Sequence, residues 1–169
     1  SRTKLNKELS RICVEYYHKT PIFSNELLNK SRLSSAISNA TRLYFKALIN
    51  NNEKEDLGFS KDKFPAEKTI YYTLLKNNGI HKKEQGEYIF KPPSKDSGSK
   101  SLWNFSIEFL KEANIAKKPL KEFKEHLLSP PMRIKEGLVD IWLPTFLFIN
   151  RQDFALYYQG QYIPEITTD

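Results

Sequence analysis

The sequence predicts a mainly α-helical chain with small β-hairpins, a fold of the α+β class. The first observation is the run 138–149, LVDIWLPTFLFI, which is apolar on nearly every face of a helix. Such a helix must be buried on most sides, and it is shorter than the roughly 20 residues that span a bilayer, so we expect a central core helix. The second observation follows directly, because 154–163 reads as two strands around a Gln159-Gly160 turn.

The order of helix and hairpin occurs twice in the sequence. The run QGEYI at 85–89 aligns with QGQYI at 159–163, at an offset of 74 residues, and the same offset sets Ile80 against Phe154. A helix followed by a hairpin is the closing unit of a winged helix, so we expect two tandem winged-helix-like modules. The alternative is two unrelated hairpins that share a common turn.

The first module, residues 1–91, is expected to contain several helices before its hairpin at 80–91. The helices follow from apolar residues at a spacing of three to four, and Pro65 and Gly79 mark the start and the end of the last one. The predicted helices are 4–18, a short one at 24–28, 31–50 and 66–78. The segment 51–63 is predicted to be a polar surface loop.

Residues 92–100, PPSKDSGSK, have the composition of a linker between the two modules. The second module, residues 101–169, is expected to contain helices at 102–114 and 119–128 before the core helix and the second hairpin. Apolar residues recur there at helical spacing. Pro130 and Pro131 end the second of these helices, because the residue before a proline is disfavoured in the helical region.

The net charge of +7 resides in the first half of the chain. Residues 1–93 contain 17 Lys and Arg against 10 Asp and Glu, whereas residues 94–169 contain 10 of each. This asymmetry favours a polyanionic partner, above all double-stranded DNA, for the N-terminal half alone. The alternative is an ordinary lysine-rich surface.

Candidate nucleic-acid-binding residues lie on the polar faces of helices 31–50 and 66–78 and on the first hairpin. Short polar side chains alternate there with Lys and Arg, an arrangement that can approach a phosphate backbone closely. The helix before the hairpin is the one expected in the major groove, by analogy with helix-turn-helix docking. The candidates are Arg32, Asn39, Arg42, Lys46, Lys68, Thr69, Tyr72, Lys76, Lys82 and Lys83. The alternative for each helix is an ordinary solvated face.

The second module has no comparable basic surface. Its core helix is apolar nearly all round, and the hairpin residues 156–159 include no lysine. We therefore expect the C-terminal half to dock a protein partner or an ATPase domain of a longer parent chain.

Sequence patterns for catalysis or metal binding do not stand out. His18, His81 and His126 lie far apart, without ligand spacing to one another or to Cys13, which we expect to be a buried thiol. Asp140 lies near the start of the apolar helix, where we expect it to stabilise the helix N-terminus. We therefore expect no cofactor, no metal and no enzymatic activity.

Three segments together resemble a known family. They are Lys19–Asn29 (KTPIFSNELLN), Ile70–His81 (beginning IYYTLL), and Ser129–Gly137 (SPPMRIKEG) with the apolar helix and Ala155–Gly160 (ALYYQG) that follow it. They resemble the winged-helix region of large bacterial P-loop ATPases of phage-defence systems, such as the BREX-type ATPases. The resemblance implies a non-catalytic module of a DNA-associated ATPase machine, here one of antiviral defence. The sequence contains no G-x-x-x-x-G-K-[ST] motif, so a nucleotide site would lie elsewhere in a longer parent.

Two functions therefore stand side by side. The first is a DNA-binding winged-helix module whose N-terminal half contacts the phosphate backbone, as part of a larger ATPase or defence-type assembly. The alternative is a structural or protein-docking module of a larger complex without direct nucleic-acid contact. A first residue Ser1 rather than Met is compatible with a piece of a longer protein. With neither a signal peptide nor a membrane span in the sequence, we expect the protein in the cytoplasm.

Overall fold

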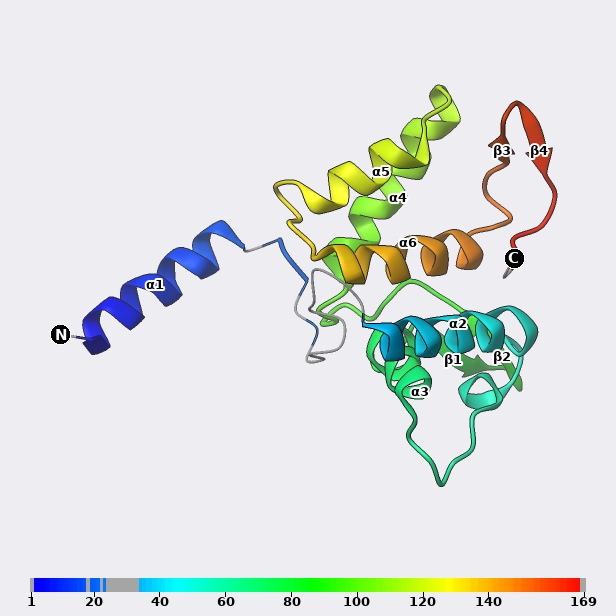
Figure 1. The fold of residues 1–169 in the computed structure, drawn as a ribbon, viewed down its shortest axis with the longest axis horizontal. Helices are drawn as coiled ribbons and strands as arrows, with labels where there is room; N and C mark the ends of the chain where they lie inside the picture. Colours follow the sequence, from blue (N-terminus) through cyan, green and yellow to red (C-terminus); the bar gives the residue numbers. More distant parts are fainter. Residues whose placement is uncertain (1, 18, 22, 24–33, 168–169) are drawn as a thin grey trace.

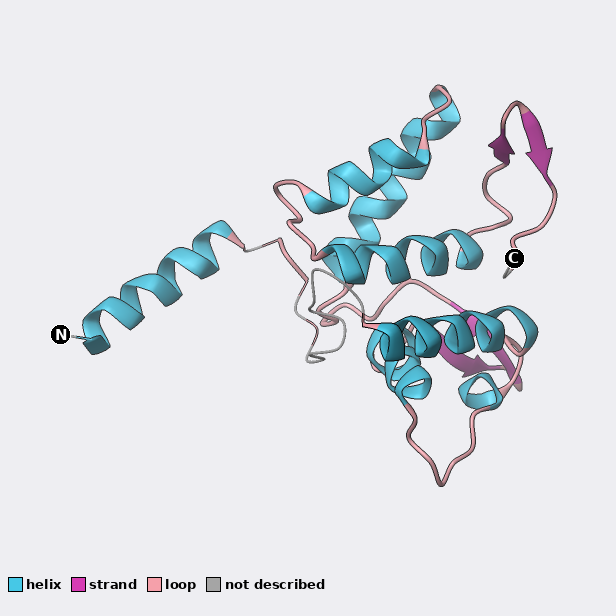
Figure 2. Ribbon diagram, viewed as in Figure 1, coloured by secondary structure: helices cyan, strands magenta, loops and turns pink. Residues whose placement is uncertain are grey.

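The protein, described by a computed structural model over residues 2–17, 19–21, 23 and 34–167, has the α+β fold that the sequence predicts (Figures 1 and 2). The short helix predicted at 24–28 and the start of the helix predicted at 31–50 lie outside these residues. In chain order the elements are α1 (Arg2–Tyr16), α2 (Ser35–Asn50), the 3₁₀ turn η1 (Glu55–Gly58), α3 (Ala66–Tyr71), the π-helical turn η2 (Tyr72–Lys76), β1 (His81–Glu84), β2 (Glu87–Phe90), α4 (Lys100–Ile115), α5 (Leu120–Leu128), α6 (Glu136–Ile149), β3 (Leu156–Tyr158) and β4 (Gln161–Ile163).

Helix α2 forms one wall of the core. It begins after Ser34, whose Oγ accepts a hydrogen bond of 3.4 Å from the backbone N–H of Ile37, because a serine at this position satisfies a donor that the first turn leaves free. Ile37, Ala40, Tyr44 and Leu48 recur at helical spacing and are buried. The apolar stripe predicted for this helix is confirmed at these positions, whereas Ala36, which is also predicted to belong to it, is exposed.

The helix before the first hairpin is α3 continued by η2. Its last turn is wider than an α-helix, because Asn77 N–H donates to Tyr72 C=O at 2.9 Å, five residues back. After it, Gly79 N–H donates to Lys76 C=O and Ile80 N–H donates to Leu75 C=O, both at 3.0 Å, the two bonds that close a helix at a glycine. Gly79 then ends it with φ of +69°. A glycine adopts this left-handed backbone without the penalty that a side chain brings, which confirms the predicted stop.

Helix α6 lies at the centre of the core, as its sequence predicts. Trp142 is fully buried, with ring centroids 6.3 Å from Trp103 and 5.8 Å from Phe146. Its indole Nε1–H donates to Ser106 Oγ at 3.0 Å, so the one polar atom of this large side chain keeps a partner inside the core. Within the described part of the chain, no helix is long and apolar enough to cross a membrane.

The two halves share one core across the contact between α2 and α6, which run side by side (Figure 1). Tyr44 O–H and Thr145 Oγ1 are 3.0 Å apart and buried. The Thr145 hydroxyl donates to Ile141 C=O at 2.7 Å, so Tyr44 is the donor to Thr145. Burial raises the pKa of Tyr44, and the phenol therefore stays protonated.

The segment predicted as a linker, 92–100, is held against the first half by hydrogen bonds. Ser97 Oγ donates to Asn78 Oδ1 at 2.6 Å, and Ser94 N–H donates to Asn78 C=O at 3.0 Å. Ser99 is fully buried at the start of α4. The segment therefore connects the two halves while hydrogen-bonded to the first one, and is not a free linker.

Both predicted hairpins are confirmed, and their turns are alike. Gln85 and Gly86 have φ of 51° and 96°, and Gln159 and Gly160 have φ of 49° and 82°, as a two-residue turn with positive φ at both positions requires. The strand registers also match at the offset of 74 residues, since Lys82 pairs with Ile89 in one hairpin and Leu156 pairs with Ile163 in the other. Whether each half is a winged helix stays a prediction.

Three local predictions are wrong. Cys13 is exposed, because α1 buries none of its residues. The segment 51–63 does not lie wholly on the surface, since Asp56 and Leu57 in η1 are buried and both adopt left-handed backbone. Asp140 lies in the second turn of α6, where its carboxylate accepts a hydrogen bond from Lys124 Nζ at 2.8 Å.

Candidate functional site

The helix predicted to enter the major groove, α3 with η2, does not expose its first lysine to solvent. Lys68 is 1% exposed, so the expectation that it points to solvent is wrong. Its ammonium donates to the carbonyls of Ser60 at 2.7 Å and Lys63 at 3.2 Å, and lies 4.0 Å from the Phe64 ring centroid. The loop before α3 therefore folds over Lys68 and satisfies its buried charge, as burial of an ammonium requires.

The next polar residues of this helix are also held by internal contacts. Thr69 Oγ1 donates to Pro65 C=O at 3.2 Å. Tyr72 O–H donates to Asp56 Oδ2 at 2.7 Å, and Lys76 Nζ forms an ion pair with the same carboxylate and donates to Tyr72 Oη at 2.9 Å. Burial alone would raise the pKa of Asp56, but the hydrogen bonds from Lys76 and Tyr72 outweigh it and lower that pKa. Lys76 is 40% exposed, but its charge is paired within this polar cluster of the first half.

The polar face of α2 is the one part of the predicted set that stays together and exposed. Asn39, Arg42 and Lys46 are exposed at helical spacing, and Arg42 Nη2 donates to Asn39 Oδ1 at 3.1 Å. The remaining candidate on this helix segment, Arg32, lies outside the described residues. The face therefore presents two cations within one helical turn of each other, which suits a phosphate contact.

The two hairpin lysines are exposed but diverge. Successive residues of a strand point to opposite faces, so Lys83 shares a face with the buried His81, and Lys82 lies on the other face with Glu84. Glu84 pairs with Lys91 at 2.9 Å on that outer face, and this contact lowers the pKa of Glu84. The outer face thus carries charges of both signs, and the two lysines cannot both contact the phosphates of the same DNA strand.

His81 anchors the first hairpin to the core. Its Nε2 lies 2.8 Å from Asn52 C=O, which can only accept, so Nε2 carries the proton. Its Nδ1 lies 2.8 Å from Tyr71 Oη. In the neutral ring this nitrogen accepts a hydrogen bond from the Tyr71 hydroxyl. Burial lowers the pKa of His81, in keeping with the neutral form. This histidine has a structural position with every polar atom paired.

The second hairpin exposes large apolar side chains on both of its strands. Tyr157, Tyr158 and Tyr162 are exposed, Tyr158 to 67%, and Ile163 is exposed beside them. The rings of Tyr157 and Tyr162 lie 5.9 Å apart across the strands, and Lys117 Nζ of the preceding α4–α5 connection lies 4.8 Å from the Tyr157 centroid. We call Tyr157, Tyr158, Tyr162 and Ile163 the tyrosine hairpin.

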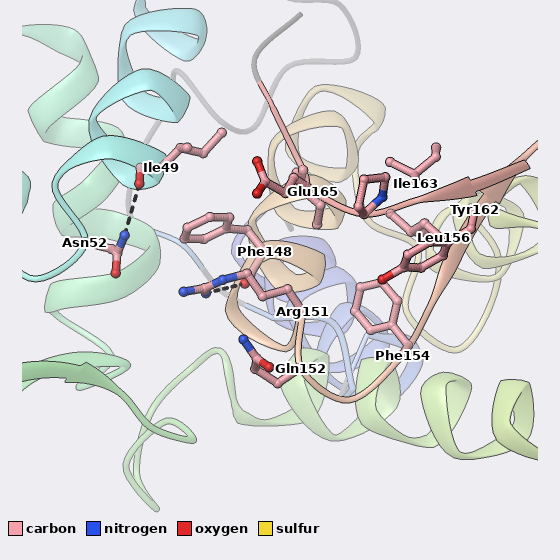
Figure 3. Close-up of a pocket in the computed structure, with 12 residues that line it drawn as sticks. Ile49, Asn52, Phe148, Arg151, Gln152, Phe154, Leu156, Tyr162, Ile163 and Glu165 are labelled. Carbon is pink, nitrogen blue, oxygen red and sulfur yellow. Dashed lines mark hydrogen bonds between the residues drawn. The ribbon is translucent and has the colours of Figure 1, made fainter.

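A hollow of about 470 Å³ lies between this hairpin and the ends of α2 and α6 (Figure 3). Aromatic and apolar side chains line it together with polar side chains from three segments that are distant in sequence, and the polar surface is the larger part. The lining residues are Ile49, Asn52, Phe148, Arg151, Gln152, Phe154, Leu156, Tyr162, Ile163, Pro164, Glu165 and Ile166. The hollow therefore offers polar and aromatic contacts side by side.

The polar groups of the hollow carry both signs of charge. Arg151 follows α6, donates from Nη1 to Phe148 C=O at 2.8 Å and lies 4.2 Å from the Phe148 ring centroid. Glu165 enters from the segment after β4, on the other side of Phe148 (Figure 3). A cation, a carboxylate and aromatic walls match the backbone and side chains of a peptide better than they match a polyanion.

Sequence reasoning missed this hollow because its members become neighbours only in the fold. One local signal was present, since β3 carries the apolar residues Leu156, Tyr157 and Tyr158 in succession. A strand with one buried face needs apolar residues only at alternate positions. Apolar residues on both faces leave at least some of them exposed, as Tyr157 and Tyr158 are.

The described part of the chain contains no group of three His, Cys, Asp or Glu residues that could hold a metal ion. Comparison of the chain with models of known protein families, with curated proteins and with solved structures gave no match.

Proposed function

We propose that the chain is a non-catalytic docking module that binds a protein partner, or another domain of a longer parent, through the tyrosine hairpin and the hollow beside it. The observation that supports this function best is the exposure of four large apolar side chains on β3 and β4. Tyrosine is enriched where protein interfaces concentrate their binding energy. An isolated two-stranded hairpin is marginally stable in water, so a partner that covers this one would also stabilise it.

The resemblance to winged-helix regions of phage-defence ATPases implies a non-catalytic module of a DNA-associated ATPase machine, which agrees with a docking role. The hollow supplies what a docking segment would need, with Arg151 and Glu165 able to pair with charges of either sign. Each strand of the hairpin also has one edge without a neighbouring strand in its sheet, and such an edge can add a strand of another chain.

Site-specific photo-crosslinking in the source organism tests this function. A photoreactive phenylalanine analogue at Tyr158 should give discrete adducts with a defined protein, or with another domain of the parent. The matched control is the same analogue at Lys121, which is exposed on α5. Identical faint adducts at both positions would contradict the docking function, because exposure alone would then explain the reaction.

A second candidate function, binding to double-stranded DNA, is favoured by the exposed face of α2 with Asn39, Arg42 and Lys46. The internal bonds of Lys68 and Lys76 restrict this candidate to the α2 face and the two hairpin lysines. Fluorescence anisotropy with a duplex at low salt tests it, since phosphate contacts weaken steeply as salt rises. Changing Arg42 and Lys46 together to Ala should lower affinity for all sequences alike, whereas absence of binding at low salt would end this candidate.

A further inference from the structure

An apolar groove lies between α2 and α6, which run side by side (Figure 1). It encloses about 330 Å³, at the lower end of the roughly 300–1,000 Å³ that small-molecule sites occupy. Its walls include the half-buried Phe45 and Pro144 and the buried Leu48 and Phe148. The groove meets the hollow at Phe148, whereas Tyr162 lines the hollow alone. It is therefore a second candidate site beside the docking surface.

A threonine in the wall of this groove has a hydroxyl group without a hydrogen bond. Thr41 lines the groove and is only 9% exposed, and its Oγ1 has no hydrogen-bond partner among the described residues. A buried hydroxyl that makes no hydrogen bond is uncommon and costs stability. An acceptor atom of a molecule bound in the groove would satisfy it.

The one charged side chain among the described residues that line the groove is Arg42. It is exposed, and its Nη2 donates to the neutral Asn39 Oδ1 at 3.1 Å, so this contact leaves its charge uncompensated. Most of the five N–H donors of a guanidinium thus remain free, and their planar fork matches a carboxylate. Lys46, one turn further along α2, is also exposed, while Glu165 lines the hollow and not the groove. The charge beside the groove is therefore positive.

We propose that the groove binds a small amphipathic carboxylate, with its apolar body between Phe45 and Pro144 and its carboxylate at Arg42. The hydroxyl of Thr41 is a further donor to the same group. Apolar walls with a few polar groups that fix the orientation of the ligand are usual in small-molecule sites. A DNA phosphate has no apolar body to fill the groove, and an apolar amine would meet the wrong charge. The proposal does not depend on the docking role of the tyrosine hairpin.

Octanoate and octylamine test this proposal on the full chain, because both have a flexible apolar chain and they carry opposite charges near pH 7. In NMR titrations of isotope-labelled protein, octanoate should shift the amides of groove residues such as Phe45 and Leu48. It should bind about tenfold more tightly than octylamine, as one hydrogen bond to a charged group can provide. The proposal is overturned if octylamine binds as tightly, if octanoate shifts no groove amide, or if the shifts are confined to Arg151 and Tyr162 of the hollow.

Matched variants on α2 identify the contacts. Arg42→Gln should weaken octanoate binding about tenfold, whereas Lys46→Gln is the control and should change it less than about twofold, because an exposed charge outside the groove is screened. Thr41→Val should weaken octanoate binding about threefold without lowering the stability of the fold, since it removes an unpaired hydroxyl and keeps a similar shape.

Two results with these proteins would contradict the site. Equal losses in Arg42→Gln and Lys46→Gln would mean that net charge, and not a contact in the groove, attracts the anion. Duplex DNA that shifts the α2 amides while octanoate shifts none would assign this face to phosphate contacts instead. Either result leaves the crosslinking test at Tyr158 unaffected, so failure of this site and failure of the docking function are distinguishable.

Discussion

The two hairpins share a turn and a register, yet β1–β2 packs against the core through His81, Tyr88 and Phe90, whereas five of the six strand residues of β3–β4 are exposed. The difference begins at one position of the repeat, where His81 in the first hairpin corresponds to Ala155 in the second. His81 reaches both Asn52 and Tyr71, whereas alanine has no group to bond. Phe90, the strand partner of His81, corresponds to Pro164, which has no N–H for a ladder bond. The same local fold is therefore structural in one copy and available for contact in the other.

The largest expected effect comes from the residue that precedes each hairpin. Ile80 is fully buried and Phe154 is half-buried. Ile80→Ala should therefore lower the free energy of unfolding by about 3 kcal/mol, and Phe154→Ala by about 1 kcal/mol although it removes more atoms. Chemical denaturation of both variants measures the two costs. If the phenylalanine change cost more, the second hairpin would be packed as tightly as the first.

The histidine anchor should give the next largest effect and a pH dependence. At pH 7.5 His81→Ala should lower the free energy of unfolding by about 2 kcal/mol, because it leaves Asn52 C=O and Tyr71 O–H without their partner. Its folded-state pKa lies below the unfolded value, so this contribution is fully present above the unfolded value of about 6.5. It is lost as pH falls through the folded pKa, at up to about 1.4 kcal/mol per pH unit.

Chemical denaturation of wild type and His81→Ala at pH 7.5 and at pH 5.5 checks the direction of this pH dependence. The difference in free energy of unfolding between the two proteins should be smaller at pH 5.5. Ala155→His is the matched control, since position 155 is exposed and the new imidazole should change stability by less than about 0.5 kcal/mol at either pH. A gap that stays constant with pH would mean that His81 is not held neutral by its surroundings.

The hairpins could be predicted from the sequence because their turns depend on adjacent residues. The burial of one and the exposure of the other could not, because His81 bonds to Asn52, 29 residues away. The same limit applies to the candidate site. Helical spacing placed Lys68 and Lys76 on a polar face, but the left-handed backbone at Asp56 and the loop carbonyls that bind Lys68 have no periodic signal. The face of α2 could be predicted because no loop of the described residues covers it.

Alanine substitutions at the two turn glycines introduce the same backbone strain into both hairpins. They test whether the loss of stability depends on how tightly each hairpin is packed. A Cβ added at Gly86 or at Gly160 would meet nothing within 4 Å, so each substitution by alanine strains only the positive φ. Gly86→Ala should cost about 1 kcal/mol, because the packed hairpin cannot relax. Gly160→Ala should cost less than about 0.5 kcal/mol in global unfolding, because β3–β4 can open locally. Chemical denaturation measures the loss of stability of Gly86→Ala. For Gly160→Ala, the amides of β4 should exchange their hydrogens faster than in wild type.

The smallest expected effect separates stability from binding at one pair of tyrosines. Tyr88 is half-buried, with its ring 5.3 Å from His81, and it corresponds to the exposed Tyr162 of the tyrosine hairpin. Tyr88→Ser should lower the free energy of unfolding by about 1 kcal/mol, whereas Tyr162→Ser should change it by less than about 0.5 kcal/mol. If the Tyr162→Ser variant is as stable as wild type but no longer crosslinks to the partner, Tyr162 contributes to partner binding and not to the stability of the fold. If Tyr162→Ser destabilised the fold as much as Tyr88→Ser, its ring would be holding the second hairpin in place, and the contrast between the two copies would fail at that position.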